Sequence, residues 1–162
     1  MKALLFAALL GAAVPLQPVV AEAFDRAQHL PAQPLTITGD RTSHRFQVEV
    51  ARSQQQQAIG LMFREVIPAD HGMIFPLQPP RMASFWMKNT LASLDLLFVR
   101  ADGTISSISP NATPLSLAPI ESIEPVAAVL ELKGGEAARR GIKPGDRVNW
   151  QGSSLRDRPQ AG

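Results

Sequence analysis

Residues 84–90, which read SFWMKNT, place a cation, an amide and a hydroxyl among large apolar residues, and Asp95 follows in the next apolar run. Burying such polar groups costs free energy unless each is hydrogen-bonded or paired with an opposite charge. Two interpretations follow. Lys88 and Asp95 form an ion pair that fixes a turn, or they line a cleft with Trp86 and Asn89 and bind a ligand there.

The carboxylates of Asp95 and Glu131 suggest acid–base catalysis as an alternative to ligand binding. Asp95 and Glu131 both lie within apolar runs and could serve as the acid and base of a hydrolase that cleaves an envelope polysaccharide. However, the order Leu130, Glu131, Leu132 also fits an ordinary strand whose glutamate points to solvent. Asp95 and Glu131 are therefore the candidate catalytic residues of an alternative function. The main prediction is a non-catalytic binding or structural module.

Arg64 is a further candidate for ligand binding. It follows Gly60 and three large apolar residues, and a guanidinium group binds a carboxylate through two parallel hydrogen bonds. The carboxylate belongs either to a ligand or to the protein itself. Asp70, Glu65 and Glu131 are the internal candidates, and we expect an internal partner.

The composition gives no support for a metal centre, a cofactor or a nucleophilic triad. The chain has no cysteine, which excludes disulfides, thiol catalysis and thiolate metal sites. The three histidines are scattered, without the spacing of metal ligands. No serine lies in a recognisable nucleophile motif. We expect no metal and no cofactor.

Charge and size restrict the partners. The net charge is +2, and no cluster of lysine and arginine precedes the last residues of the chain, so nucleic acid is not an expected partner. The expected partner is a small molecule, a peptide or an envelope component. The length suits one domain with a single core, and we expect a monomer.

Residues 1–23 have the features of a signal peptide. Lys2 precedes a short apolar stretch, and residues 21–23 read Ala-Glu-Ala, the small-x-small pattern of a signal-peptidase site. We expect cleavage after Ala23, a periplasmic or secreted protein, and no transmembrane span after cleavage. An uncleaved N-terminal anchor is the alternative.

Patterning predicts many short strands. Alternating apolar and polar residues over 35–38 and 46–50 predict a hairpin. Ser53 and Gln56 predict a capping box that starts a short helix, which ends at Gly60. Further strands are expected at 72–75, 85–89, 94–99, 104–109, 126–132 and 147–150, and one helical turn at 136–140. Three prolines between 76 and 80 predict that the strand at 72–75 stops there, and residues 110–125 predict an irregular loop.

These elements indicate a mainly β fold, a β-rich α+β class that forms a compact closed or nearly closed β-barrel with one or two short helices. The expected organisation is a signal peptide at 1–23, a flexible tether at 24–34, a single domain at 35–150 and a disordered tail at 151–162.

Several blocks, taken in order, resemble the domain-of-unknown-function 192 family. They are VEVA at 48–51, GLMFR at 60–64, GMIF at 72–75, FWMKNT at 85–90, LD at 94–95, VLEL at 129–132 and GD at 145–146. The resemblance covers residues 35–150 and implies a compact β-rich domain, commonly behind a signal peptide in bacteria. It implies no reaction. Residues 111–124 depart from the family pattern, and the loop at 110–125 is a possible contact surface for another envelope protein.

Overall fold

The computed structural model describes residues 26–152. The predicted signal peptide and residues 153–162 of the predicted tail lie outside this range. The elements, in chain order, are β1 (Ala32–Thr38), β2 (Ser43–Val50), α1 (Gln54–Ile59), β3 (His71–Arg81), β4 (Ser84–Phe85), β5 (Leu94–Val99), β6 (Ile105–Ala112), β7 (Ile120–Glu121), β8 (Val126–Lys133), α2 (Glu136–Arg140) and β9 (Arg147–Trp150).

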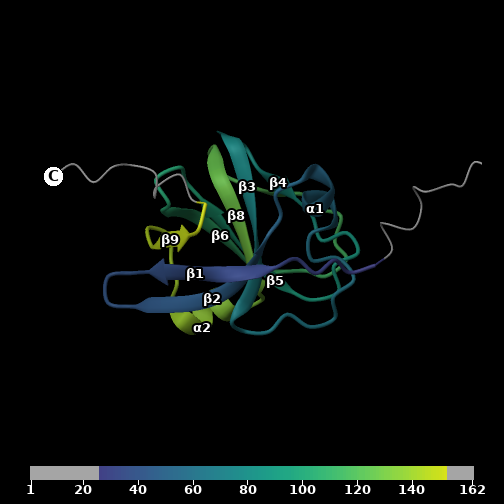
Figure 1. Cartoon of the computed structure of the whole chain (residues 1–162), viewed down its shortest axis with the longest axis horizontal. Helices are drawn as coiled ribbons and strands as arrows, with labels where there is room; N and C mark the ends of the chain where they lie inside the picture. Colours follow the sequence, from purple (N-terminus) through teal and green to yellow (C-terminus); the bar gives the residue numbers. More distant parts are fainter. Residues whose placement is uncertain (1–25, 153–162) are drawn as a thin grey trace, which may run out of the picture.

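Seven strands form one curled sheet with the order β6-β5-β8-β3-β2-β1-β9, and β4 pairs with β7 in a small separate sheet (Figure 1). Neighbours in the large sheet are antiparallel except β2 and β3. The sheet forms a half-barrel whose edges touch, because Thr104 bridges Arg147 of β9 and the Val148 N–H donates to the Gly103 carbonyl at 2.8 Å. The predicted β-rich, nearly closed barrel is confirmed.

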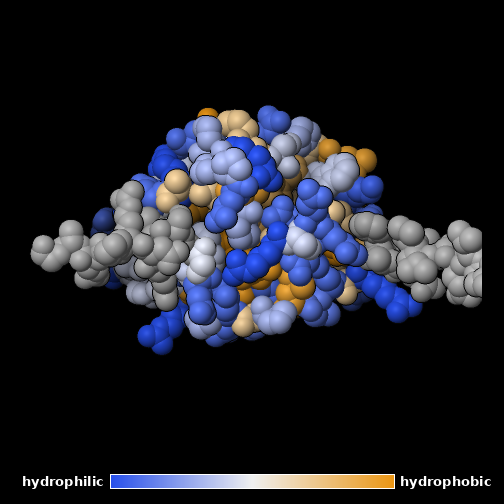
Figure 2. All heavy atoms as spheres, turned by 45° about the horizontal axis from the view of Figure 1, so that its top comes forward, coloured by the Kyte–Doolittle hydropathy of each residue, from blue (hydrophilic) through white to orange (hydrophobic). Residues whose placement is uncertain are grey.

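The strands β5 and β8 and residues 72–77 of β3 are buried on both faces. Inside the curl, the first core joins residues from both edges of the sheet, among them Leu35, Ile105 and Trp150. On the outer face of these three strands lies the second core, which is covered by the segments around Leu61 and Met87. The face seen in Figure 2 is mostly hydrophilic, with hydrophobic residues at the base of a hollow near its middle.

Strand register decides which core each polar residue faces. In the ladder between β5 and β8, Asp95 pairs with Leu132, and Leu96 pairs with Glu131. Cross-strand partners share a face, and consecutive residues alternate between faces. Because Leu132 belongs to the first core and Leu96 to the second, the carboxyl groups of Asp95 and Glu131 point to opposite faces of the sheet.

Local sequence signals place the first elements correctly. The predicted hairpin is β1 and β2. The capping box is present, since the Ser53 hydroxyl accepts from the Gln56 N–H at 3.1 Å and the Gln56 side chain accepts from the Ser53 N–H at 3.0 Å. The Gln57 amide donates to the Pro76 carbonyl at 3.0 Å, which ties α1 to β3.

Two strand predictions were wrong. β3 does not stop before the prolines but continues to Arg81, and its pairing with β8 shifts register between Pro76 and Arg81. The prolines therefore occupy the stretch where ladder hydrogen bonds are interrupted, which is where strands tolerate them. The strand predicted at 85–89 is reduced to β4, and residues 87–90 form a turn in which the Thr90 N–H donates to the Met87 carbonyl at 3.0 Å.

Residues of the predicted tether at 24–34 make hydrogen bonds to the domain. β1 begins at Ala32, before the expected domain start at residue 35. The Gln28 side chain donates to the Gln56 and Gly60 carbonyls at 2.7 and 3.0 Å, and the Leu30 N–H donates to Glu49 at 2.6 Å. The domain therefore includes residues from Gln28 onward.

Candidate functional site

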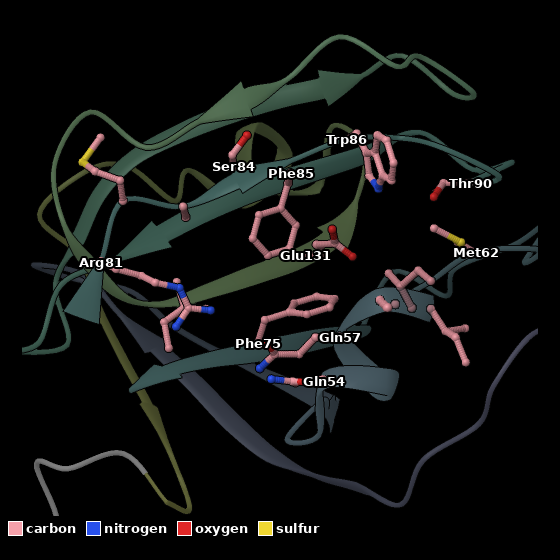
Figure 3. A pocket seen from close by; sticks show the side chains of 17 residues that line it. Gln54, Gln57, Met62, Phe75, Arg81, Ser84, Phe85, Trp86, Thr90 and Glu131 are labelled. Carbon is pink, nitrogen blue, oxygen red and sulfur yellow. The ribbon is translucent and has the colours of Figure 1, made fainter. Parts of the chain in front are cut away.

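A pocket of about 410 Å³ opens between α1 and β4, against the second core. We call it the α1-β4 pocket. The lining side chains come from α1, the turn after it, β3, β4, the segment after β4 and β8 (Figure 3). The polar and aromatic ones are Gln54, Gln57, Phe75, Arg81, Ser84, Phe85, Trp86, Thr90 and Glu131.

Aromatic rings form much of the pocket wall. The rings of Phe75 and Phe85 meet edge to face, with centroids 5.1 Å apart and planes at 83°. Trp86 is 50% exposed, and the ammonium group of Lys88 lies 5.2 Å from its ring centroid. Aromatic walls with a few polar groups are typical of small-ligand pockets.

Glu131 is the polar group most deeply placed in this pocket. It is only 5% exposed, and its partners in the ladder, Met73 and Leu96, are apolar and fully buried. Figure 3 shows its carboxyl group among the lining side chains, with Phe75 and Phe85 on either side in this view. None of the hydrogen bonds within residues 26–152 reaches this carboxyl group. Burial therefore raises the pKa of Glu131 to about 8, because the charged form loses its hydration without a replacement.

The interpretation of Glu131 as an outward residue of an ordinary strand was wrong. The alternation of Leu130, Glu131 and Leu132 does reflect two faces of β8, but both faces are covered. Glutamate is almost never fully buried unless it is paired, so an unpaired one that faces a pocket indicates a binding or catalytic group.

Asp95 has a structural role on the opposite face. Its side chain is fully buried; one oxygen accepts from the N–H groups of Asn111 and Gly135 at 2.8 and 2.9 Å, and the other accepts from the Ala137 N–H at 2.9 Å. Gly135 is the N-cap of α2 and has no side chain with which to cap it. Asp95 therefore caps α2 from a neighbouring strand.

This position of Asp95 removes the geometric basis of the paired-carboxylate hydrolase. An acid and a base that act on one glycosidic bond must flank it from within one site, but Asp95 and Glu131 face opposite sides of the sheet. Lys88 does not pair with Asp95 either, since Lys88 is exposed beside Trp86. Of the predicted cleft, Trp86 lines the pocket, whereas Lys88, Asn89 and Asp95 do not.

Asn89 and Arg64 stabilise the surroundings of the pocket. The Asn89 carbonyl accepts from the Phe63 N–H at 2.8 Å, which joins the turn after β4 to the turn after α1. The Arg64 guanidinium group binds both oxygens of Glu49 at 2.7 and 2.8 Å. Burial opposes ionisation of Glu49, yet hydrogen bonds from Arg64 and Leu30 hold the pKa of its carboxyl group below the ordinary value. An internal partner for Arg64 is thus confirmed, but it is Glu49 rather than any of the three predicted residues.

The remaining lining residues, Phe75, Phe85, Arg81 and the two glutamines of α1, were not predicted as site residues. They come from three separate elements, α1, β3 and β4, that meet only after the sheet curls, so no local motif contains them together. The one available signal was the order of the GLMFR, GMIF, FWMKNT and VLEL blocks, each of which contributes at least one lining residue. In the described part of the chain, no helix has the length and apolar character needed to cross a membrane.

Comparison with known proteins places the chain among uncharacterised relatives. It is similar to a protein of unknown function from Novosphingobium aromaticivorans DSM 12444, with 45% identity, a TM-score of 0.73, and coverage of 86% of this chain and 94% of the other. It is also similar to a protein from Sinorhizobium meliloti 1021 described as a candidate transcription regulator, with 40% identity, a TM-score of 0.74, and coverage of 77% and 98%. No curated protein matches. Because the model of the domain-of-unknown-function 192 family, described as an uncharacterized ACR, matches residues 35–150, the chain belongs to that family.

Proposed function

We propose that this chain is an exported binding module that holds a small organic ligand in the α1-β4 pocket. The observation that carries the proposal is the buried carboxyl group of Glu131, which faces the pocket without a hydrogen-bond partner among the described residues. Among the described residues, the fully buried side-chain atoms without a partner are on His44, Arg64 and Trp150 and not on Glu131, so the Glu131 carboxyl group is open to the pocket. A ligand that hydrogen-bonds to it would replace water there, and Phe75, Phe85 and Trp86 would bind the apolar part of the ligand.

Export is the second part of the proposal. It is supported by the sequence features of residues 1–23, namely Lys2, the apolar stretch and the Ala-Glu-Ala pattern before residue 24. The mass of the protein recovered from a periplasmic extract tests it: we expect a mature chain that begins at Phe24, whereas a full-length chain in the cytoplasmic fraction would contradict export.

The two tryptophans provide a test of the pocket. The chain contains only Trp86 and Trp150; Trp86 lines the pocket, whereas Trp150 is buried in the first core. We expect small aromatic fragments to shift the indole N–H signal of Trp86 in a two-dimensional NMR spectrum while that of Trp150 stays in place. Isothermal titration calorimetry, which does not depend on the indole signal, should show that Trp86→Ala weakens fragment binding by roughly tenfold, as expected for the loss of one large aromatic contact.

A suitable control is Met82→Ala, because Met82 is also exposed and lines the same pocket but lacks a ring. Fragments that shift the Trp150 signal as strongly as that of Trp86, or that bind equally well to Trp86→Ala, would show that the α1-β4 pocket is not the binding site.

A further inference from the structure

We propose that the polar group of the ligand is a protonated amine, whose N–H groups bind the Glu131 carboxylate while its apolar part packs against Phe75, Phe85 and Trp86. This inference rests on the proposed function of the α1-β4 pocket and adds the chemical class of the ligand.

The first argument is the missing counter-ion. Apart from Glu131 itself, the only charged residue among the described residues that line the pocket is Arg81. Arg81 is exposed and forms neither an ion pair nor a hydrogen bond with Glu131. The cross-strand partners of Glu131, which are Met73 and Leu96, are apolar and offer no charge. A cation in close contact stabilises the ionised form of a buried carboxyl group. Arg81 does not make that contact, so a cationic ligand is the group that would make it.

The second argument is the aromatic wall. The faces of aromatic rings attract cations, and a desolvated cation gains more from this attraction than an exposed one. Lys88 shows this preference at the surface, where its ammonium group lies against the Trp86 ring. Three rings and one carboxyl group in a single pocket thus favour an ammonium group that is attached to an apolar body. They disfavour an anion, which Glu131 would repel once ionised.

The rival interpretation is that Glu131 stays neutral and donates a hydrogen bond to a ligand oxygen. The two interpretations predict opposite pH dependence. The charged or titratable groups that line the pocket are Glu131 on β8 and Arg81 on β3, whereas α1 contributes glutamines and residues 84–90 contribute Ser84, Phe85, Trp86 and Thr90. Of these two groups, Glu131 is the one whose pKa burial raises to about 8.

An amine that needs the carboxylate binds only the ionised fraction of the protein, so its apparent affinity scales with that fraction. With a Glu131 pKa of about 8, the ionised fraction, and thus the affinity for an amine, rises roughly 50-fold from pH 6 to pH 8. A ligand that accepts a hydrogen bond from the neutral carboxyl group would bind equally well at pH 6 and pH 7 and would lose affinity above pH 8.

The experiment compares three fragments of nearly equal shape: 2-phenylethylamine, 2-phenylethanol and phenylacetate. Each is titrated at pH 6, 7 and 8 with the Trp86 indole N–H signal as the readout and the Trp150 signal as the reference. We expect the amine to bind at least tenfold more tightly than the alcohol at pH 8, to gain affinity with rising pH, and to outcompete phenylacetate at pH 8, where half of the Glu131 carboxyl groups are ionised. In Glu131→Gln, the preference for the amine and its pH dependence should both disappear, while the alcohol still binds.

The outcomes separate the two proposals. If the alcohol and the amine bind equally in the pocket, or if affinity falls as pH rises, the amine inference is overturned and the pocket remains a ligand site. If none of the three fragments shifts the Trp86 signal in the parent protein, the proposed function of the pocket fails as well. A preference for the amine that persists in Glu131→Gln would also overturn the inference, because the preference would then come from the rings alone.

Discussion

Replacing Asp95 with alanine is expected to lower the free energy of unfolding by about 4 kcal/mol, which is a large share of the stability of a domain of this size. The carboxylate accepts hydrogen bonds from three backbone N–H groups, those of Asn111, Gly135 and Ala137. Alanine would leave these donors without a partner, and each unsatisfied buried donor costs about 1–3 kcal/mol. Urea denaturation, followed by the fluorescence of Trp150 in the first core, measures the loss.

The matched control is Asp95→Asn. Its carbonyl oxygen can still accept from the N–H groups of Asn111 and Gly135, but its amide group presents donors to the Ala137 N–H, which is itself a donor. The asparagine variant should therefore lie between the parent and the alanine variant in stability. An alanine variant as stable as the parent would contradict the capping role of Asp95. An alanine variant that folds normally but no longer binds fragments would instead place Asp95 in the ligand site.

Glu131→Gln is expected to remove a pH-dependent loss of stability of about 3 kcal/mol between pH 5 and pH 8. The folded-state pKa of Glu131, about 8, lies above its ordinary value of 4.5, so the folded protein keeps a proton that the unfolded chain releases. The stability that this proton confers is fully present below about pH 4.5 and is lost as the pH rises through 8. Glutamine has nearly the same shape and does not ionise.

The measurement is the difference in unfolding free energy between parent and variant, taken by urea denaturation at pH 5, 6.5 and 8. Other titrating groups contribute equally to both proteins and cancel in the difference. Glu121→Gln serves as the control for the loss of one carboxyl group, because Glu121 lies exposed on β7. A flat curve for Glu131→Gln would mean that Glu131 is ionised in the folded protein and has a partner.

The sequence predicts most strands because period-2 alternation and turn residues are local properties. The hairpin of β1 and β2, the capping box of α1 and the strand β8 all follow from short windows. The extension of β3 to Arg81 does not, since prolines usually end a strand. Only the register shift against β8 shows how the sheet accommodates them.

The site is less predictable than the fold because burial on the second face of a strand is a tertiary property. The Leu-Glu-Leu pattern of β8 has the same appearance whether the glutamate faces water or a second core. What makes Glu131 unusual is the cover supplied by α1 and β4, which are distant in sequence. The role of Asp95 had a weak local signal, in that Gly134 and Gly135 precede α2 without a capping side chain.

The partner of Arg64 was also missed because it is a tertiary contact between residues that are distant in sequence. The predicted partners either lie close in sequence, as Glu65 and Asp70 do, or stand in the block at 129–132. The observed partner, Glu49, lies on β2, and the pair also holds the backbone of Gln28 and Leu30. Such a contact depends on how the chain enters the domain, which the composition of residues 24–34 does not indicate.

The state of the Glu131 carboxyl group can be measured directly by carbon-13 NMR, with its carboxyl signal identified by its loss in Glu131→Gln. We expect a titration midpoint near pH 8 in the free protein and a clearly lower midpoint when 2-phenylethylamine is present, because the bound ammonium group favours the carboxylate. A midpoint near the ordinary value of 4.5 that does not move when the amine is added would contradict both the unpaired carboxyl group and the amine site.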